Sequence, residues 1–127
     1  MPEAKAYSYA VVRVVPRVER DEFVNAGVLL FCQELRFLSA ATAVHDHRIL
    51  ALWPEADLES IHRHVRAIYR ICAGDPEAGA IARLPQKDRF HWLTAPRSTT
   101  IQVSPVRTGL TTDPQATLMC LAKDLVS

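Results

Sequence analysis

The sequence predicts an α+β fold in which an antiparallel sheet of about four strands is covered by helices. Runs rich in β-branched residues come first in the chain, and segments with helical periodicity follow them. The length points the same way, because 127 residues are the usual size of one domain with its own core. We therefore expect a single domain over residues 1–127 with the order βββ-α-α-α-β-α.

Four segments have the residue pattern of strands. They are expected over Tyr7–Pro16, Phe23–Cys32, Arg36–Val44 and Thr99–Val103. The first is apolar on both faces apart from Arg13, which is typical of a central strand covered on both sides, or covered on one side and paired with a partner chain on the other. A short charged connector, residues 17–21, indicates that the first two strands are antiparallel neighbours.

Helices are marked by apolar periodicity and by capping residues. They are expected over 46–53, Asp57–Ala73 and Pro85–Ala95 and from Asp113 onward, with a shorter one beginning at Asp75. The clearest is the second, whose core stripe consists of Leu58, Ile61, Val65, Ile68 and Cys72. Asp46 and Asp57 are expected as N-caps, and Gly74 as the residue that ends the longest helix.

The composition disfavours a disordered chain and a non-specific nucleic-acid binder. Charged residues make up 23% and hydrophobic residues 49% of the chain, which is typical of a globular protein. The formal net charge of +1 argues against a non-specific nucleic-acid binder, which would have a clear basic excess. A nucleic-acid partner is therefore not expected.

The cysteines and the apolar segments predict the compartment. Cys32, Cys72 and Cys120 lie far apart and form no Cys-x-x-Cys pair, so we expect reduced and mostly buried thiols. No segment has the roughly 18 apolar residues of a membrane span, and no signal peptide is recognisable. The expectation is a cytoplasmic protein without membrane contact.

Two segments carry a resemblance to a known family: residues 22–28 (EFVNAGV) and residues 90–99 (FHWLTAPRST). Together with 13–16 (RVVP), 101–102 (IQ) and 104–106 (SPV), they make the chain similar to a bacterial family of domains of unknown function, number 3037. The resemblance implies no assigned activity. It implies a small bacterial protein that acts beside a kinase-like partner.

A dispersed set of polar residues is the candidate for a ligand-binding site. It comprises Arg13, Glu22, Asn25, Arg97, Ser98 and Gln102, with Arg20 and His91 in the same segments. Burying such groups without partners costs roughly several kcal/mol each, so they either pair with one another or bind something. We expect Arg13 to pair with Glu22 across the connector, and Arg97 to approach the same place.

Three interpretations of this set remain open. It could be an ion-pair network that holds one end of the sheet together. It could be an anion pocket, in which Arg13 and Arg97 bind a phosphate or carboxylate bidentately while Ser98 and Gln102 add hydrogen bonds. It could also be part of a surface that contacts another protein.

Other polar clusters give weaker signals. The segment His45–His47 could begin a metal site, but no matching ligands stand out elsewhere, so a polar loop is expected and no metal. Arg63, Arg66 and Arg70 form a stripe that is either solvated or a contact surface for an acidic partner. No phosphate loop or nucleophile elbow is present, and no cofactor is predicted.

These observations favour a small accessory or binding module that acts with a partner protein. The resemblance implies that this partner is a kinase-like protein. The alternative is an enzyme or sensor that binds a phosphate or nucleotide through the Arg/Ser/Gln set. Whether the protein catalyses a reaction is left open by the sequence. Convergence of Arg13 and Arg97 in one pocket would favour the alternative.

Overall fold

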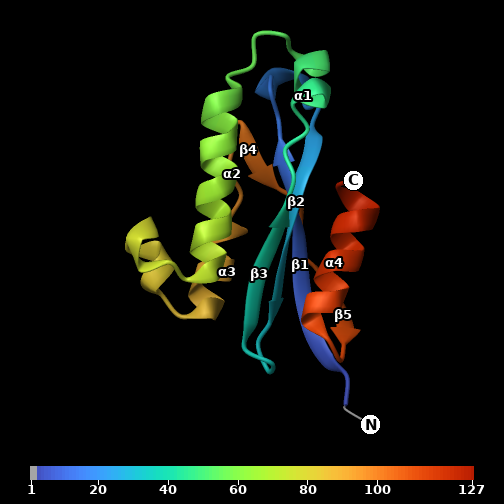
Figure 1. Cartoon of the computed structure of the whole chain (residues 1–127), viewed down its shortest axis with the longest axis vertical. Coiled ribbons are helices and arrows are strands. Elements are labelled where there is room, and N and C mark those ends of the chain that lie inside the picture. The colour runs from blue at the N-terminus through green and yellow to red at the C-terminus, as the bar shows by residue number, and fades with distance from the viewer. Residues whose placement is uncertain (1–2) are drawn as a thin grey trace.

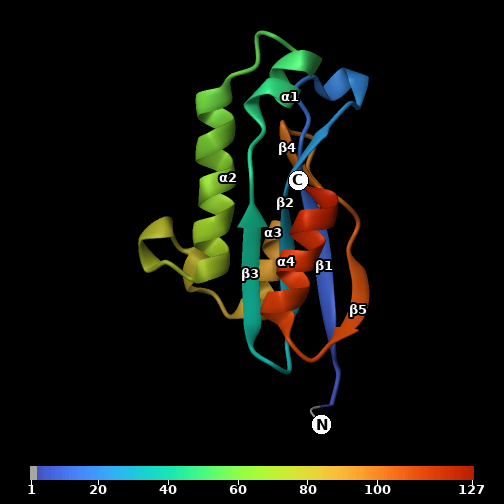
Figure 2. The same ribbon diagram turned by 45° about the vertical axis from the view of Figure 1, so that its right-hand side comes forward.

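The computed structural model describes residues 3–127 and confirms the α+β class. The strands are β1 (Lys5–Val14), β2 (Val24–Cys32), β3 (Phe37–Thr42), β4 (Ile101–Val103) and β5 (Arg107–Thr111). They form one antiparallel sheet in the order β3-β2-β1-β4, and β5 pairs with the other end of β1. β1 is the central strand, as its two apolar faces predict, and Figure 2 shows β5 along its lower half.

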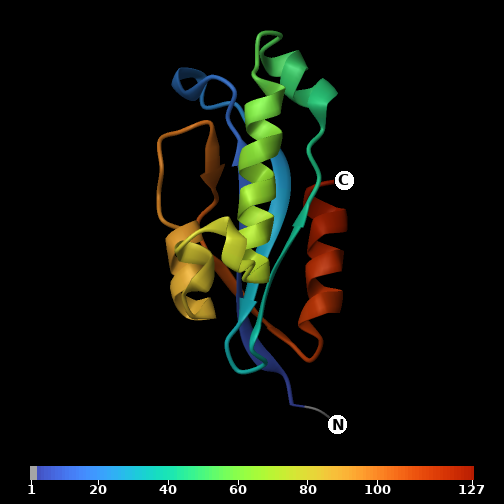
Figure 3. The ribbon, with the colours of Figure 1, turned by 60° about the vertical axis from the view of Figure 1, so that its left-hand side comes forward.

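The helices form layers on both faces of this sheet. They are α1 (Asp46–Leu52), α2 (Leu58–Ala73), α3 (Gln86–Leu93) and α4 (Pro114–Leu125). Figures 1 and 3 show α2 and α3 on one side and α4 on the other, with α1 at the upper end. Short 3-10 turns lie at Val18–Arg20, Pro76–Ala78 and Ile81–Arg83. No helix among residues 3–127 is long and apolar enough to cross a membrane.

Each face of the sheet has its own hydrophobic core. On the α2 side, Val12 and Val14 of β1 pack with Ile61 and Val65 of α2, and these two helix residues are buried as predicted. Ile68 is only half-buried at the edge of this core. On the α4 side, the core residues are Val28, Leu30, Cys32, Leu118 and Val126. Side chains that alternate along β1 and β2 therefore enter two different cores.

Local capping explains where the helices begin and end. Asp57 accepts a hydrogen bond from the Ser60 N–H, and Gly74 takes the left-handed conformation with φ 73° at the end of α2. The prediction that Asp46 caps α1 is wrong. The N-cap position is His45, and the Asp46 carboxylate lies 2.7 Å from His62 Nε2 on α2.

The sequence reading missed β5, because Thr108 and Gly109 have the composition of a turn. Gly109 instead lies in mid-strand opposite Tyr7 of β1. A Cβ atom at position 109 would lie 2.6 Å from the Tyr7 hydroxyl oxygen, so the tyrosine ring occupies the space that a side chain would need. A side chain at position 109 would therefore require the Tyr7 ring to move.

Candidate functional site

Three of the predicted polar residues form a row across the sheet. Arg13 of β1 is paired with Asn25 of β2 on one side and with Gln102 of β4 on the other. Directly opposed residues of antiparallel strands point to the same face. The Asn25 side-chain amide donates to the Leu125 carbonyl at 3.0 Å, which identifies this face as the one that α4 covers.

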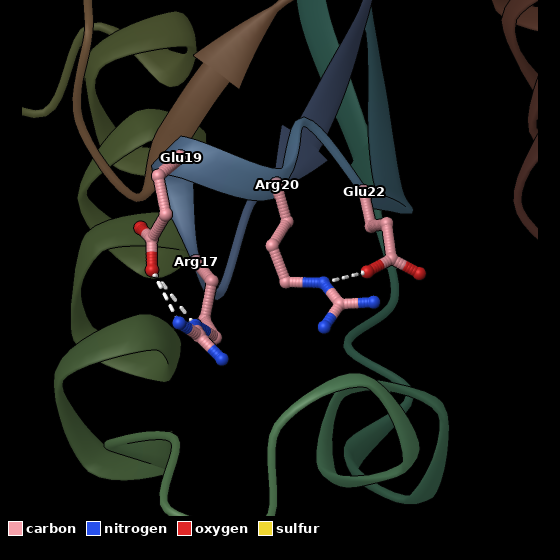
Figure 4. A network of polar contacts seen from close by, with 4 residues as sticks. All are labelled: Arg17, Glu19, Arg20 and Glu22. Atoms are coloured by element: carbon pink, nitrogen blue, oxygen red, sulfur yellow. Dashed lines mark hydrogen bonds and ion pairs between the residues drawn. The ribbon is translucent and has the colours of Figure 1, made fainter.

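Glu22 does not join this row, and the predicted ion pair between Arg13 and Glu22 is wrong. Its carboxylate binds the Arg20 guanidinium at 2.5 Å, beside a second local pair of Arg17 with Glu19 (Figure 4). The reason is the length of the connector. β1 ends at Val14 and β2 begins at Val24, so Glu22 lies beyond the paired strands.

Arg13 has an aromatic neighbour instead of a carboxylate. Its guanidinium carbon lies 4.2 Å from the ring centroid of Phe23, a cation–π contact. The Arg13 Nε atom is buried and has no acceptor among residues 3–127, and the neighbouring Asn25 Oδ1 is also buried without a donor. Arg13 is therefore half-buried in the central strand without a counter-charge in the described part of the chain.

Arg97 lies on the opposite face, so the predicted convergence of Arg13 and Arg97 is wrong. Its two terminal nitrogens donate to the carbonyls of Trp92, Leu93 and Ala95 at the end of α3. Its guanidinium also stacks on the Trp92 ring, at 4.5 Å. Arg97 thus closes the C-terminus of α3, and Ser98 follows it as an exposed residue of the α3–β4 connection.

The Arg97 side of the sheet carries a surface pocket between α2 and β4, of about 210 Å³, which we call the α2–β4 pocket. It is lined by His64, Ala67, Ile68, Ile71, Trp92, Leu93, Arg97, Thr99, Ile101, Gln102 and Val103. The lining is mostly apolar, and its polar groups lie at the rim. A second depression, toward α1, shares His64 and Thr99 with it, so the two are neighbours on the surface.

Sequence reasoning found two residues of this pocket, Arg97 and Gln102, and missed His64 and Trp92. His64 is exposed on the side of α2 that faces the pocket, and the Trp92 side chain is 42% exposed. The exposed tryptophan could have been found as an apolar residue outside the core periodicity of α3. Its contact with Arg97 depends on the folded connection and has no sequence signal.

A buried arginine on the same side was also missed. Arg89 of α3 is 8% exposed and donates to the carbonyls of Ile71 and Cys72, at the end of α2, and of Leu84. Two of these bonds reach carbonyls in the last turn of α2, where the helix ladder runs out of donors, and the Ile71 carbonyl also accepts from the Gly74 N–H. Burial raises the pKa of the nearby Cys72 thiol to about 12, which disfavours the reactive thiolate at neutral pH.

The histidine loop that resembled the start of a metal site is occupied by protein contacts. His45 Nε2 lies 2.7 Å from the Val126 carbonyl oxygen, and Asp46 pairs with His62. His47 is exposed. These contacts connect the start of α1 to the end of α4 and to α2, so the residues of this loop stabilise the fold.

Together, the fold and the pocket define an α+β antiparallel-sheet domain with an apolar hollow on its α2 side. The chain belongs to the family DUF3037, described as a protein of unknown function, whose model matches residues 9–126. The match covers nearly the whole chain, including both faces of the sheet. Comparison with curated proteins and with solved structures gave no match.

Proposed function

We propose that this domain is a binding module that recognises a segment of a partner protein through the α2–β4 pocket. The observation that supports the proposal is the pocket itself, an apolar hollow at the surface with a 42% exposed tryptophan on its rim. Exposed apolar surface of this kind is typical of interaction sites, and tryptophan is enriched among the residues that dominate binding energy.

The chemistry of the pocket indicates what the partner segment would present. Ile68, Leu93 and Ile101 offer a floor for one apolar side chain. Arg97 lies at the rim, and its terminal nitrogens already donate to backbone carbonyls. Arg97 would therefore act on a partner mainly through its positive charge, because its terminal nitrogens are already used. We expect an acidic residue of the partner segment to lie beside the apolar side chain that fills the pocket.

A kinase-like protein is the candidate partner, because the family resemblance implies such a neighbour. The alternative function, an enzyme or sensor in which both arginines bind one anion together with Ser98 and Gln102, has less support. Arg13 and Arg97 lie on opposite faces of the sheet and cannot grip one anion. A partner module does not need both arginines in one place.

The experiment that tests the proposal compares two matched alanine substitutions. Ala67→Glu places a charged side chain in the pocket from an exposed position of α2. Ala116→Glu does the same on the exposed first turn of α4, where an acidic residue suits the helix N-terminus. In co-purification with the kinase-like neighbour, we expect Ala67→Glu to lose the complex and Ala116→Glu to keep it. Equal retention of a complex by both variants would contradict the proposal.

A further inference from the structure

Arg13 occupies a position that folding alone does not favour. It stands in the central strand, between Val12 and Val14 of the α2-side core, with its side chain on the opposite face. Its buried Nε–H meets no acceptor among residues 3–127, and an unsatisfied buried donor is unfavourable. An apolar residue of similar length would fit the strand without this cost.

The polar neighbours of Arg13 do not compensate it. Asn25 directs its amide to the Leu125 carbonyl, and Gln102 directs its amide to the Thr99 carbonyl at 2.8 Å. Glu22, the carboxylate expected beside it, is held by Arg20. The arrangement therefore presents a positive charge without using it in an ion pair of the described chain.

The contact with Phe23 keeps this charge in one orientation. The ring lies against the guanidinium at 4.2 Å, and Phe23 is itself 45% exposed. Stacking occupies a face of the guanidinium, while its N–H groups point outward in the plane of the group. Because Nε is buried, the two terminal nitrogens are the ones whose N–H groups match the two oxygens of a carboxylate.

We infer that Arg13 and Phe23 form a binding site for a carboxylate that is attached to an apolar group. A carboxylate fits better than a phosphate, because the site has one positive charge and lies beside the C-terminal end of α4. That helix end carries partial negative charge, and the unpaired Asn25 Oδ1 adds an acceptor, so a doubly charged phosphate is disfavoured. Exposed Phe23 supplies the apolar contact.

This site is independent of the α2–β4 pocket, since the two lie on opposite faces of the sheet. Its ligand could be a free small carboxylate or a carboxylate on a protein. Both sources share the chemistry that Arg13 recognises, so a small probe can test the site without the natural ligand. If Ala67→Glu kept the partner complex, the proposal for the α2–β4 pocket would fall and the inference about Arg13 would stand. If Arg13 bound no carboxylate, the proposal for the pocket would likewise stand.

The test is a titration of the ¹⁵N-labelled full chain with sodium benzoate, followed by backbone amide chemical shifts. We expect saturable shifts around Arg13 and Phe23, with a Kd on the order of millimolar, as suits one ion pair and one ring contact. Neutral benzamide should leave these amides unshifted, and inorganic phosphate at equal ionic strength should bind more weakly. Saturable phosphate shifts stronger than those of benzoate would overturn the assignment to a carboxylate.

Variants of Arg13 distinguish a ligand-binding residue from one that only stabilises the fold. Arg13→Met should remain folded, lose the benzoate response and unfold at a urea midpoint equal to or above that of the wild type. Arg13→Lys keeps the charge without the bidentate fork and should bind benzoate roughly tenfold more weakly. The control Arg66→Met, at an exposed position of α2, should respond like the wild type. Retained benzoate shifts in Arg13→Met, or a strong loss of stability in that variant, would overturn the inference.

Discussion

Three arginines of this chain place a guanidinium near the core in three different ways. Arg89 is buried and satisfied by three backbone carbonyls, and Arg97 closes the end of α3 while stacking on Trp92. Arg13 stacks on the ring of Phe23 and forms no ion pair among residues 3–127. A sequence shows the arginine but not the carbonyls, because helix-end carbonyls become acceptors only after the chain has folded.

The role assigned to Arg89 can be measured directly. Arg89→Met should lower the free energy of unfolding by about 2 kcal/mol, because the buried Ile71 and Cys72 carbonyls lose a charged donor. Urea denaturation of both proteins gives the value. Lys87→Met on the exposed side of the same helix serves as the control and should change stability little. An unchanged midpoint for Arg89→Met would show that water replaces its bonds at no cost.

The cysteines provide a second test at the residue scale. The expectation that the thiols are mostly buried holds for Cys32 and Cys72, but Cys120 is exposed on α4. In the native protein at neutral pH, iodoacetamide should modify Cys120 first. Cys72, whose pKa burial raises to about 12, should react only on unfolding. Mass spectrometry of the labelled protein would contradict this account if Cys72 were modified as fast as Cys120.

At the scale of elements, the sequence predicted best where a local signal is complete. α2 was predicted nearly to the residue, because its apolar stripe, Asp57 and Gly74 all agree. β5 was missed, because its glycine is explained only by Tyr7 on a strand about a hundred residues earlier. The β1–β2 connector was placed too short, and that single error produced the wrong partner for Arg13.

The pairing of β5 with β1 should depend on Gly109. Gly109→Ala places a methyl group where the Tyr7 ring lies, so the ring must move or β5 must separate from β1. We expect a loss of roughly 1–3 kcal/mol, as for other overpacked sites. Combining it with Tyr7→Ala should recover part of that loss, because the clash is then gone. Additive losses in a double-mutant cycle would contradict the contact.

The end of α2 should be sensitive to acid. The hydrogen bond from Arg70 is the main cause that lowers the pKa of the Asp75 carboxyl, and the Glu77 backbone N–H adds to it. A carboxyl with a lowered pKa stabilises the fold above its unfolded pKa, near 4, and loses this contribution as pH falls through the folded value. At about pH 6, the urea midpoint of the wild type should therefore be higher than that of Asp75→Asn. The difference between the two midpoints should become smaller as the pH falls below about 4. A constant difference across that range would contradict the ionic origin.

For the whole molecule, the sheet divides the candidate residues between two faces. One face carries Arg13 and Asn25 beside α4, and the other carries Arg97 and the α2–β4 pocket. Gln102 of the edge strand β4 pairs with Arg13 and also belongs to the lining of that pocket. The sequence could predict which residues are polar and which strands hold them, since alternation is local. It could not predict the face of Arg97, because that residue precedes β4 in a connection whose path is set by the end of α3.

The central claim of this account is that the α2 side of the sheet contacts a protein partner through the α2–β4 pocket. It is tested most directly by photo-crosslinking in cells, with a benzophenone amino acid at position 67 in the pocket or at position 116 on α4. The account predicts a discrete covalent adduct from position 67, identifiable by mass spectrometry, and none of that mass from position 116. The same adduct from both positions, or an adduct from position 116 alone, would contradict the claim.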